Sequence, residues 1–248
     1  MSEKTLSGKT VLITGASSGI GNQVAIECSR QGATVIVTGR NKNRLQATFD
    51  QLEGNNHSLI TANLTNEDEL KKFVEQLPKL NGLVHCAGVL HTYPIKFLNQ
   101  QKIRETFSAN FDMAVMLVAQ LSTQKKIEKG ASFVFMSSVS GKYPHKGNSL
   151  YCASKAALEA FSKTVALEFQ HLLLRSNCIC PSMIKTPMYD KAEEGMSKEL
   201  MDEHIAKYPL GLGYPSDIAD MAIFLLSEKS RWITGTDITV DGGFMLAK

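Results

Sequence analysis

The sequence predicts one doubly wound α/β domain with a seven-stranded parallel sheet and helices on both faces. Short apolar runs rich in β-branched residues alternate with stretches of helical length, and a glycine-rich turn follows the first run at once. Continuous apolar runs such as 33–38 are typical of parallel strands that are buried on both faces. No Pro/Gly/Ser-rich linker divides the 248 residues, so we expect a single Rossmann-type domain over 1–248.

The predicted elements follow in order along the chain. Strands are expected at 10–14, 33–38, 58–62, 82–86, 132–136, 175–180 and 238–240. Helices are expected at about 20–30, 42–52, 66–77, 100–126, 149–173 and 216–226. Gly32 ends the first helix and Pro78 ends the third. A methionine-rich amphipathic stretch at about 182–210 interrupts the alternation, and we interpret it as a lid over a substrate pocket.

Composition excludes several functional classes. The net charge of +3 is too small to indicate a nucleic-acid partner or an anionic membrane surface. The apolar runs are too short to span a bilayer, and the first five residues contain no apolar signal region. The five cysteines form neither a C-x-x-C pair nor a metal-ligand cluster with histidine. We therefore expect a cytoplasmic protein without a metal, a membrane partner or a nucleic-acid partner.

The turn Gly15-Ala16-Ser17-Ser18-Gly19-Ile20-Gly21 lies between the first strand and the first helix. Glycines at such a turn let the backbone approach a pyrophosphate, and the helix N-terminus then faces the anion. Ser17 and Ser18 add hydroxyl donors. We therefore expect a dinucleotide site here, the alternative being a glycine-rich turn without a ligand.

The end of the second strand indicates which dinucleotide is preferred. An acidic residue at this point would accept hydrogen bonds from the adenosine ribose of NAD(H). The chain instead has Thr38-Gly39-Arg40-Asn41, in which a small residue and an arginine leave room and a bidentate partner for a 2′-phosphate. The pattern predicts a preference for NADP(H), with NAD(H) as the alternative. If Arg40 only faces solvent, it does not indicate either cofactor.

Tyr151 and Lys155 lie four residues apart on a predicted helix and so share one face. The ordinary pKa of tyrosine is about 10, and a fixed cation lowers it towards a range that is useful for proton transfer. Alone, such a pair is more often a solvated surface feature. Ser138, at the end of the fifth strand, supplies a hydroxyl thirteen residues upstream of the tyrosine.

These motifs together resemble those of the short-chain dehydrogenase/reductase family over essentially the whole chain. The motifs are Thr14 to Gly21, Cys86-Ala87-Gly88, Asn110, Ser138, Tyr151-x-x-x-Lys155, Pro181-x-x-x-x-Thr186, Trp232 to Gly235 and Val240 to Gly243. Pro209-Leu210-Gly211 and the C-terminal glycine motifs are similar to those of 3-oxoacyl-[acyl-carrier-protein] reductases. Sugar, polyol and steroid dehydrogenases share that C-terminal pattern.

The resemblance implies a role for each residue of the site. Tyr151 would donate a proton to a carbonyl oxygen, Lys155 would lower its pKa and bind the nicotinamide ribose, and Ser138 would hold the substrate oxygen. Asn110 would support a water relay to Lys155. The implied cofactor-binding residues are Gly15, Ser17, Ser18, Gly19, Ile20, Gly21, Arg40, Asn63, Leu64, Ala87, Gly88, Tyr151, Lys155, Pro181, Ile184 and Thr186.

The chain departs from the family pattern at three places. Cys86 replaces an asparagine that anchors the sheet, and Ser182 replaces a glycine beneath the nicotinamide. Lysines at 125, 126 and 129 match the first basic patch that a carrier protein would meet, whereas 172–174 are leucines where the second would lie. These leucines indicate either a helical interface of a homo-oligomer, a dimer or tetramer as the family implies, or core packing.

The substrate pocket is expected to be largely apolar. The expected lining of the lid is Met183, Ile184, Met188, Tyr189, Met196, Leu200, Met201 and Ile205, facing walls at 89–93 and 139–145. Lys142, His145 and Lys146 would attract an anionic substrate or carrier, or else remain solvated.

The leading hypothesis is an NADP(H)-dependent reduction of a ketone to a secondary alcohol, with a small ketone or 3-oxoacyl thioester as substrate and an acyl carrier protein as candidate partner. The alternatives are oxidation of a sugar, polyol or steroid alcohol, and a non-catalytic nucleotide-binding regulator. The intact Ser138, Tyr151, Lys155 and Asn110 set argues against the regulator.

Overall fold

The computed structural model describes residues 4–194 and 197–246 and contains one seven-stranded sheet in the order β3-β2-β1-β4-β5-β6-β7. All six strand pairings are parallel, which confirms the predicted fold class. The strands are β1 Thr10–Thr14, β2 Thr34–Gly39, β3 Ser58–Thr61, β4 Leu80–His85, β5 Ile127–Met136, β6 Arg175–Pro181 and β7 Asp237–Val240. The chain order reverses between β1 and β4, so ligands are expected at the carboxyl ends of these strands.

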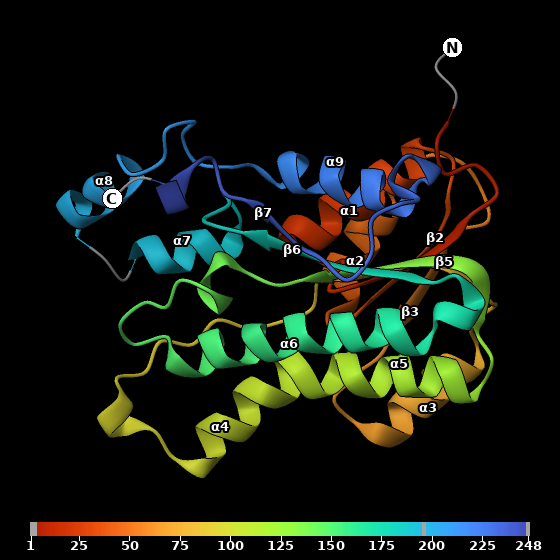
Figure 1. Ribbon diagram of the computed structural model, residues 1–248, viewed down its shortest axis with the longest axis horizontal. Helices are drawn as coiled ribbons and strands as arrows, with labels where there is room; N and C mark the ends of the chain where they lie inside the picture. Colours follow the sequence, from red (N-terminus) through yellow and green to blue (C-terminus); the bar gives the residue numbers. More distant parts are fainter. Residues whose placement is uncertain (1–3, 195–196, 247–248) are drawn as a thin grey trace.

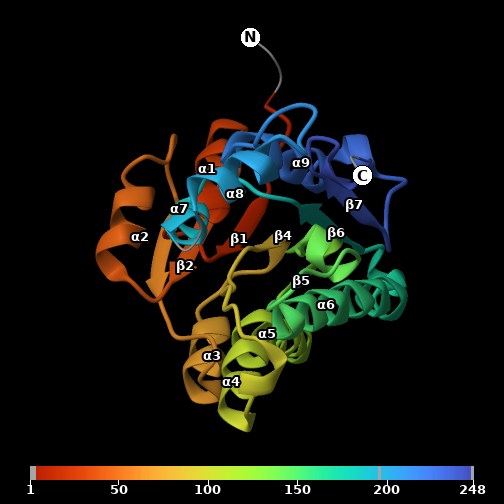
Figure 2. The same ribbon diagram turned by 90° about the vertical axis from the view of Figure 1, so that its left-hand side faces the viewer.

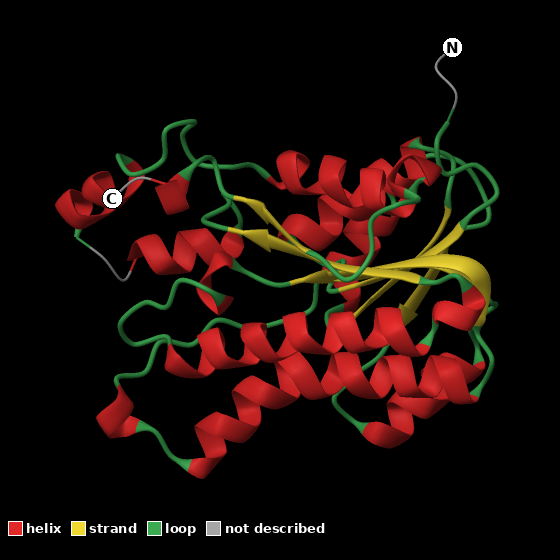
Figure 3. Cartoon of the chain, viewed as in Figure 1, coloured by secondary structure: helices red, strands yellow, loops and turns green. Residues whose placement is uncertain are grey.

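Helices cover both faces of the sheet (Figure 1, Figure 3). They are α1 Gly19–Arg30, α2 Lys42–Phe49, α3 Glu67–Glu75, α4 Gln100–Phe107, α5 Met113–Thr123, α6 Ser149–Glu168, α7 Pro187–Glu194, α8 Lys198–Ile205 and α9 Pro215–Leu226. Figure 2 shows α1, α2 and α9 on one side of the sheet and α3 to α6 on the other.

The alternation of side chains along each strand explains the two cores. Val11 and Ile13 of β1 pack into the core beneath α1 and α9, whereas Leu12 points into the core beneath α3, α5 and α6. The central positions of such a strand, Val11 to Ile13, are therefore all apolar. Burying each of these side chains contributes about 1.5–3 kcal/mol, so the central strands fix the layers.

The predicted helix 100–126 is interrupted in the structure. A π-helical turn at Ser108–Asp112 separates α4 from α5, and α5 ends at Thr123 because Lys125 adopts a left-handed backbone with φ 55°. The predicted helix 149–173 likewise ends at Glu168, and a 3₁₀ turn at Gln170–Leu172 follows it. Apolar periodicity continues through both breaks, which is why the sequence pattern concealed them.

The leucines at 172–174 divide between the two predicted environments. Leu174 is buried in the core with 3% exposure, Leu172 packs partly against that core, and Leu173 is 64% exposed with φ 55°. Core packing therefore accounts fully for Leu174, whereas the exposed Leu173 is available for a contact with another subunit. Among the described residues, no helix is both long enough and apolar enough to cross a membrane.

Candidate active site

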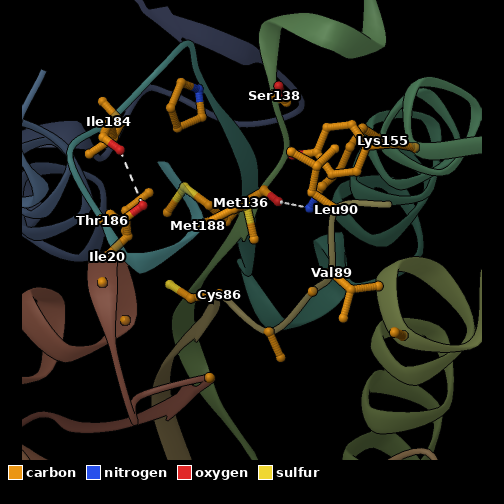
Figure 4. A pocket seen from close by; sticks show the side chains of 18 of the residues that line it. Ile20, Cys86, Val89, Leu90, Met136, Ser138, Lys155, Ile184, Thr186 and Met188 are labelled. Carbon is orange, nitrogen blue, oxygen red and sulfur yellow. Dashed lines mark hydrogen bonds between the residues drawn. The ribbon is translucent and has the colours of Figure 1, made fainter. Parts of the chain in front are cut away.

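A cavity of about 880 Å³ lies at the carboxyl ends of the strands, and Figure 4 shows part of its wall. Every residue that the sequence implicated in cofactor binding lines this cavity. Ser138, Tyr151 and Lys155 line it as well, whereas Asn110 is fully buried behind the wall. The structure thus brings the predicted lining residues together from seven separate segments.

The glycine turn packs so tightly that side chains would not fit. Gly15 has φ +66°, and a Cβ on it would lie 2.7 Å from the backbone nitrogen of Ala87. A Cβ on Gly21 would overlap the carbonyl oxygen of Gly15, and one on Gly19 would lie 3.2 Å from Thr186. The first strand–helix junction therefore depends on these three glycines.

The same junction presents a cationic, donor-rich end of the cavity. The side chain of Ser18 makes no capping hydrogen bond at the N-terminus of α1. The first backbone N–H groups of the helix therefore remain available to an anion. Arg40 and Arg44 both line the cavity beside it, and the sequence reasoning had identified only the first. In the described part of the lining no Asp or Glu is present. The residues present fit a phosphorylated dinucleotide.

Lys155 is held firmly in the wall. Its ammonium donates a hydrogen bond of 2.7 Å to the carbonyl oxygen of Met136, the last residue of β5, as Figure 4 marks. Its Nζ also lies 5.6 Å from the centre of the Tyr151 ring. The predicted pairing of ammonium and phenol on one face of α6 is therefore present.

The pKa of Tyr151 does not follow the expected direction in this structure. Burial raises the pKa of Tyr151 to about 12, and hydrogen bonding to Ser138 opposes this rise. Burial also lowers the pKa of Lys155 to about 8. The expected lowering of the tyrosine pKa is therefore wrong for this structure, because desolvation outweighs the hydrogen bond with Ser138. The phenol remains protonated at neutral pH and can act as a proton donor.

Ser138 stands where strand β5 gives way to a 3₁₀ turn. Its Oγ accepts the backbone N–H of Ser140 at 3.1 Å, which fixes the oxygen and leaves the hydroxyl hydrogen for another acceptor. The neighbouring Ser137 donates to the buried carboxylate of Glu159 at 2.8 Å. Sequence reasoning missed Glu159, which lies one turn after Lys155 and ties the end of β5 to α6.

Asn110 supports the wall from behind through the π-helical turn. Its side chain accepts the N–H of Val89 at 2.7 Å and donates to the Val89 carbonyl at 3.0 Å and to Ser154 at 3.1 Å. A Cβ on Gly88 would lie 3.0 Å from the Asn110 oxygen and 3.5 Å from the Lys155 nitrogen. Asn110 therefore fixes the loop that follows β4 immediately beside the lysine.

The two single-residue departures are accommodated locally. At the Cys86 position, Thr14 takes over the anchoring: its hydroxyl pairs with Nδ1 of His85 at 3.0 Å and accepts the N–H of Ala87 at 3.4 Å. Ser182 hydrogen-bonds the Tyr208 hydroxyl at 2.7 Å, which connects the turn after β6 to the end of the 182–210 segment. The first departure thus leaves the sheet intact, and the second adds a link.

The substrate side of the cavity differs in part from the expectation. Met183, Ile184, Met188 and Tyr189 line it as predicted, together with residues of both expected walls. Leu200, Met201 and Ile205 do not line it, and Met196 lies outside the described residues.

Three lining residues at this end were missed. They are His204, Tyr208 and Phe244, which form an aromatic group. No spacing in the sequence links the last of them to the other two. Among the described residues, no group of three His, Cys, Asp or Glu side chains is arranged to hold a metal ion.

Known proteins of similar sequence and structure include reductases and dehydrogenases. A sequence profile of the family described as enoyl-(acyl carrier protein) reductase matches residues 15–245. A 3-oxoacyl-[acyl-carrier-protein] reductase FabG of Rickettsia bellii is 34% identical over 97% of this chain and 98% of its own length. A tropinone reductase homologue of Arabidopsis thaliana is 31% identical over 97% and 93%. A short-chain type dehydrogenase/reductase structure from Mycobacterium ulcerans has a TM-score of 0.89 at 31% identity, covering 98% of this chain and 92% of that one.

Fold, site and similarity together define an oxidoreductase that acts on CH–OH or C=O groups. The chain belongs to the short-chain dehydrogenase/reductase family, whose members use a nicotinamide cofactor.

Proposed function

We propose that the protein reduces a ketone to a secondary alcohol with NADPH and that Tyr151 is the proton donor. The observation that carries this proposal is the shared cavity: Tyr151, Lys155 and Ser138 line it beyond the glycine turn, whose own end is cationic. The bound cofactor would supply the hydride. The chain's own residues orient the carbonyl and deliver the proton.

Each residue has a part that its contacts support. Ser138 donates its remaining hydroxyl hydrogen to the carbonyl oxygen, and Tyr151 gives that oxygen a proton as negative charge develops on it. Lys155, anchored on Met136, stabilises the phenolate that remains. Because the raised pKa of Tyr151 keeps its phenol protonated at neutral pH, the side chain can act as the proton donor of the reduction.

Arg40 and Arg44 support the choice of NADPH over NADH. Both guanidinium groups line the cavity end next to the glycine turn, where a 2′-phosphate would find two cations and no carboxylate in the described lining. Asn63 and Leu64 line the same end and would contact the adenine. Pro181, Ile184 and Thr186 would contact the nicotinamide from the other side.

The candidate substrate is a 3-oxoacyl thioester or a similar ketone, which the 34% identical Rickettsia reductase supports. The lysines that would meet a carrier protein lie far from the cavity of their own chain. Lys126 donates to the Leu77 and Glu75 carbonyls, and it precedes β5 at the amino end of that strand. Ten residues of β5 span about 30 Å, so a carrier docked there would be far from the cavity of the same chain.

We infer further that residues 182–210 form the substrate lid of the single domain and that the protein is a homo-oligomer. Leu167 and Leu173, at the end of α6 and just after it, are 70% and 64% exposed, which suits a subunit contact. All five cysteines are free, which suits a reducing compartment such as the cytoplasm.

The test is NADPH consumption by the purified protein with a panel of ketones and 3-oxoacyl thioesters. We expect Tyr151→Phe to lower kcat by about a thousandfold or more while NADPH affinity changes little. Tyr143→Phe is the matched control because Tyr143 is half exposed and does not line the cavity. If no ketone is consumed, the proposed reduction is wrong, and oxidation of an alcohol or the nucleotide-binding regulator takes its place; if Tyr151→Phe turns over normally, another group donates the proton.

A further inference from the structure

The substrate end of the cavity is walled by an aromatic and imidazole cluster, for which ketone reduction alone requires no role. We define it as His145, His204, Tyr208 and Phe244, all of which line the cavity. Tyr208 stacks on Phe244 with ring centroids 4.8 Å apart, His204 lies 5.4 Å from Phe244, and His145 lies 6.1 Å from it. Three segments that are distant in sequence build this wall.

The two imidazoles of the cluster retain unused hydrogen-bonding groups. Neither ring nitrogen of His145 bonds to protein within the part of the chain that the structure describes. His204 uses only Nε2, which lies 3.3 Å from the Tyr208 hydroxyl. Because both residues line the cavity, their remaining ring nitrogens are available to a bound molecule.

The charges around the cluster are predominantly positive. Lys146 lines the cavity next to His145, and the described lining contains no carboxylate. Burial lowers the pKa of both imidazoles, and the charge of Lys207 lowers it further.

Two carboxylates of neighbouring segments have other partners. Asp241 accepts the backbone N–H groups of Gly243 and Met245, and Glu193 accepts the Tyr189 hydroxyl. Neither carboxylate therefore competes for the free ring nitrogens of the imidazoles, which are neutral at pH 7 and can still donate an N–H group.

Lys142 behaves differently from the other basic residues of its loop. It was expected at the mouth of the site with His145 and Lys146, but its ammonium faces Asp237 at 3.5 Å and it does not line the cavity. The positive charge of this end of the cavity therefore comes from Lys146, and the neutral imidazoles add N–H donors. Lys142 provides a control with the same charge.

We propose that the ketone reduced at this site carries a carboxylate, which His145, His204 and Lys146 bind. This inference rests on the proposed ketone reduction and selects an oxo acid over the 3-oxoacyl thioester, whose acyl group carries no carboxylate. Single N–H donors and one ammonium suit a carboxylate, whereas the paired guanidinium groups lie at the opposite end of the cavity. Met183, Met188 and Leu90 line the space between and would contact the apolar body of the substrate.

The experiment compares a series of oxo carboxylic acids, with increasing spacing between ketone and carboxylate, against their methyl esters. Each pair differs in charge while the ketone stays the same. We expect kcat/KM for the best acid to exceed that of its ester by about tenfold or more, since charge-assisted hydrogen bonds are lost in the ester. His145→Gln and His204→Gln should each reduce this acid-to-ester ratio by about fivefold, and Lys146→Gln by about threefold.

Lys142→Gln removes the same charge from the same loop and should leave the ratio unchanged. Unaltered NADPH affinity in each variant shows that the fold is intact. The inference is overturned if esters and acids are reduced equally well, or if Lys142→Gln and Lys146→Gln change the ratio equally. Neither outcome contradicts ketone reduction itself. A protein that reduces neither class would instead overturn the proposed function itself.

Discussion

The buried ammonium of Lys155 should make the stability of the protein depend on pH in a defined way. Its side chain is 5% exposed, and burial lowers its pKa from 10.5 to about 8. Between these values the unfolded chain binds more protons than the folded one, so the free energy of unfolding rises with pH. The full shift corresponds to about 3 kcal/mol, and the gain between about pH 7 and about pH 9.5 amounts to roughly 2 kcal/mol.

The assay is urea unfolding of the wild type and of Lys155→Met at several pH values within that window. The variant lacks the titrating group, so the difference between the two free energies of unfolding isolates the lysine from the titration of other residues. We expect the wild type to gain about 2 kcal/mol relative to the variant towards the alkaline end. If the difference between the two free energies of unfolding changes by less than about 0.5 kcal/mol across the pH window, the reasoning is refuted, because the ammonium is then solvated in the folded state.

Three further outcomes follow from the geometry. Gly21→Ala should weaken NADPH binding by more than about tenfold in a fluorescence titration, because the new Cβ would displace the Gly15 carbonyl; Gly130→Ala, where the space is open, should cost only about 1 kcal/mol of stability. Asn110→Ala should lower the free energy of unfolding by about 2 kcal/mol, since it leaves both backbone groups of Val89 unpaired, and an unchanged melting temperature would contradict this. Arg40→Gln combined with Arg44→Gln should raise the dissociation constant of NADPH about tenfold or more and leave that of NADH nearly unchanged; equal losses for both cofactors would count against a 2′-phosphate site.

The layers of the fold could be predicted because buried parallel strands are apolar on both faces. Strand β1 was predicted with its observed bounds for this reason. Strand β5 begins at Ile127, five residues before its predicted start, because Leu80 pairs with Ile127 across an irregular register that includes polar, exposed residues. Periodicity detects burial, and these residues are not buried.

The glycine turn and the arginine beside it could be predicted to share one cavity because both belong to a short contiguous part of the sequence. Gly15, Gly19 and Gly21 lie in a single turn, and Arg40 follows the next strand. The substrate end could not be predicted in the same way, since Phe244 meets His204 and His145 only through the tertiary fold. The pKa of Tyr151 was misjudged for a related reason: sequence spacing gives the neighbouring charge but not the degree of burial.

The transfer of deuterium from a specifically deuterated NADPH tests the central claim most directly. Wild-type protein is incubated with the labelled cofactor and a ketone, and the product is examined by mass spectrometry and NMR. Ketone reduction at the Tyr151 site predicts deuterium on the carbinol carbon of a secondary alcohol, and no such product from Tyr151→Phe in the same time. An alcohol without deuterium at that carbon, or no alcohol from any ketone of the panel, would contradict it.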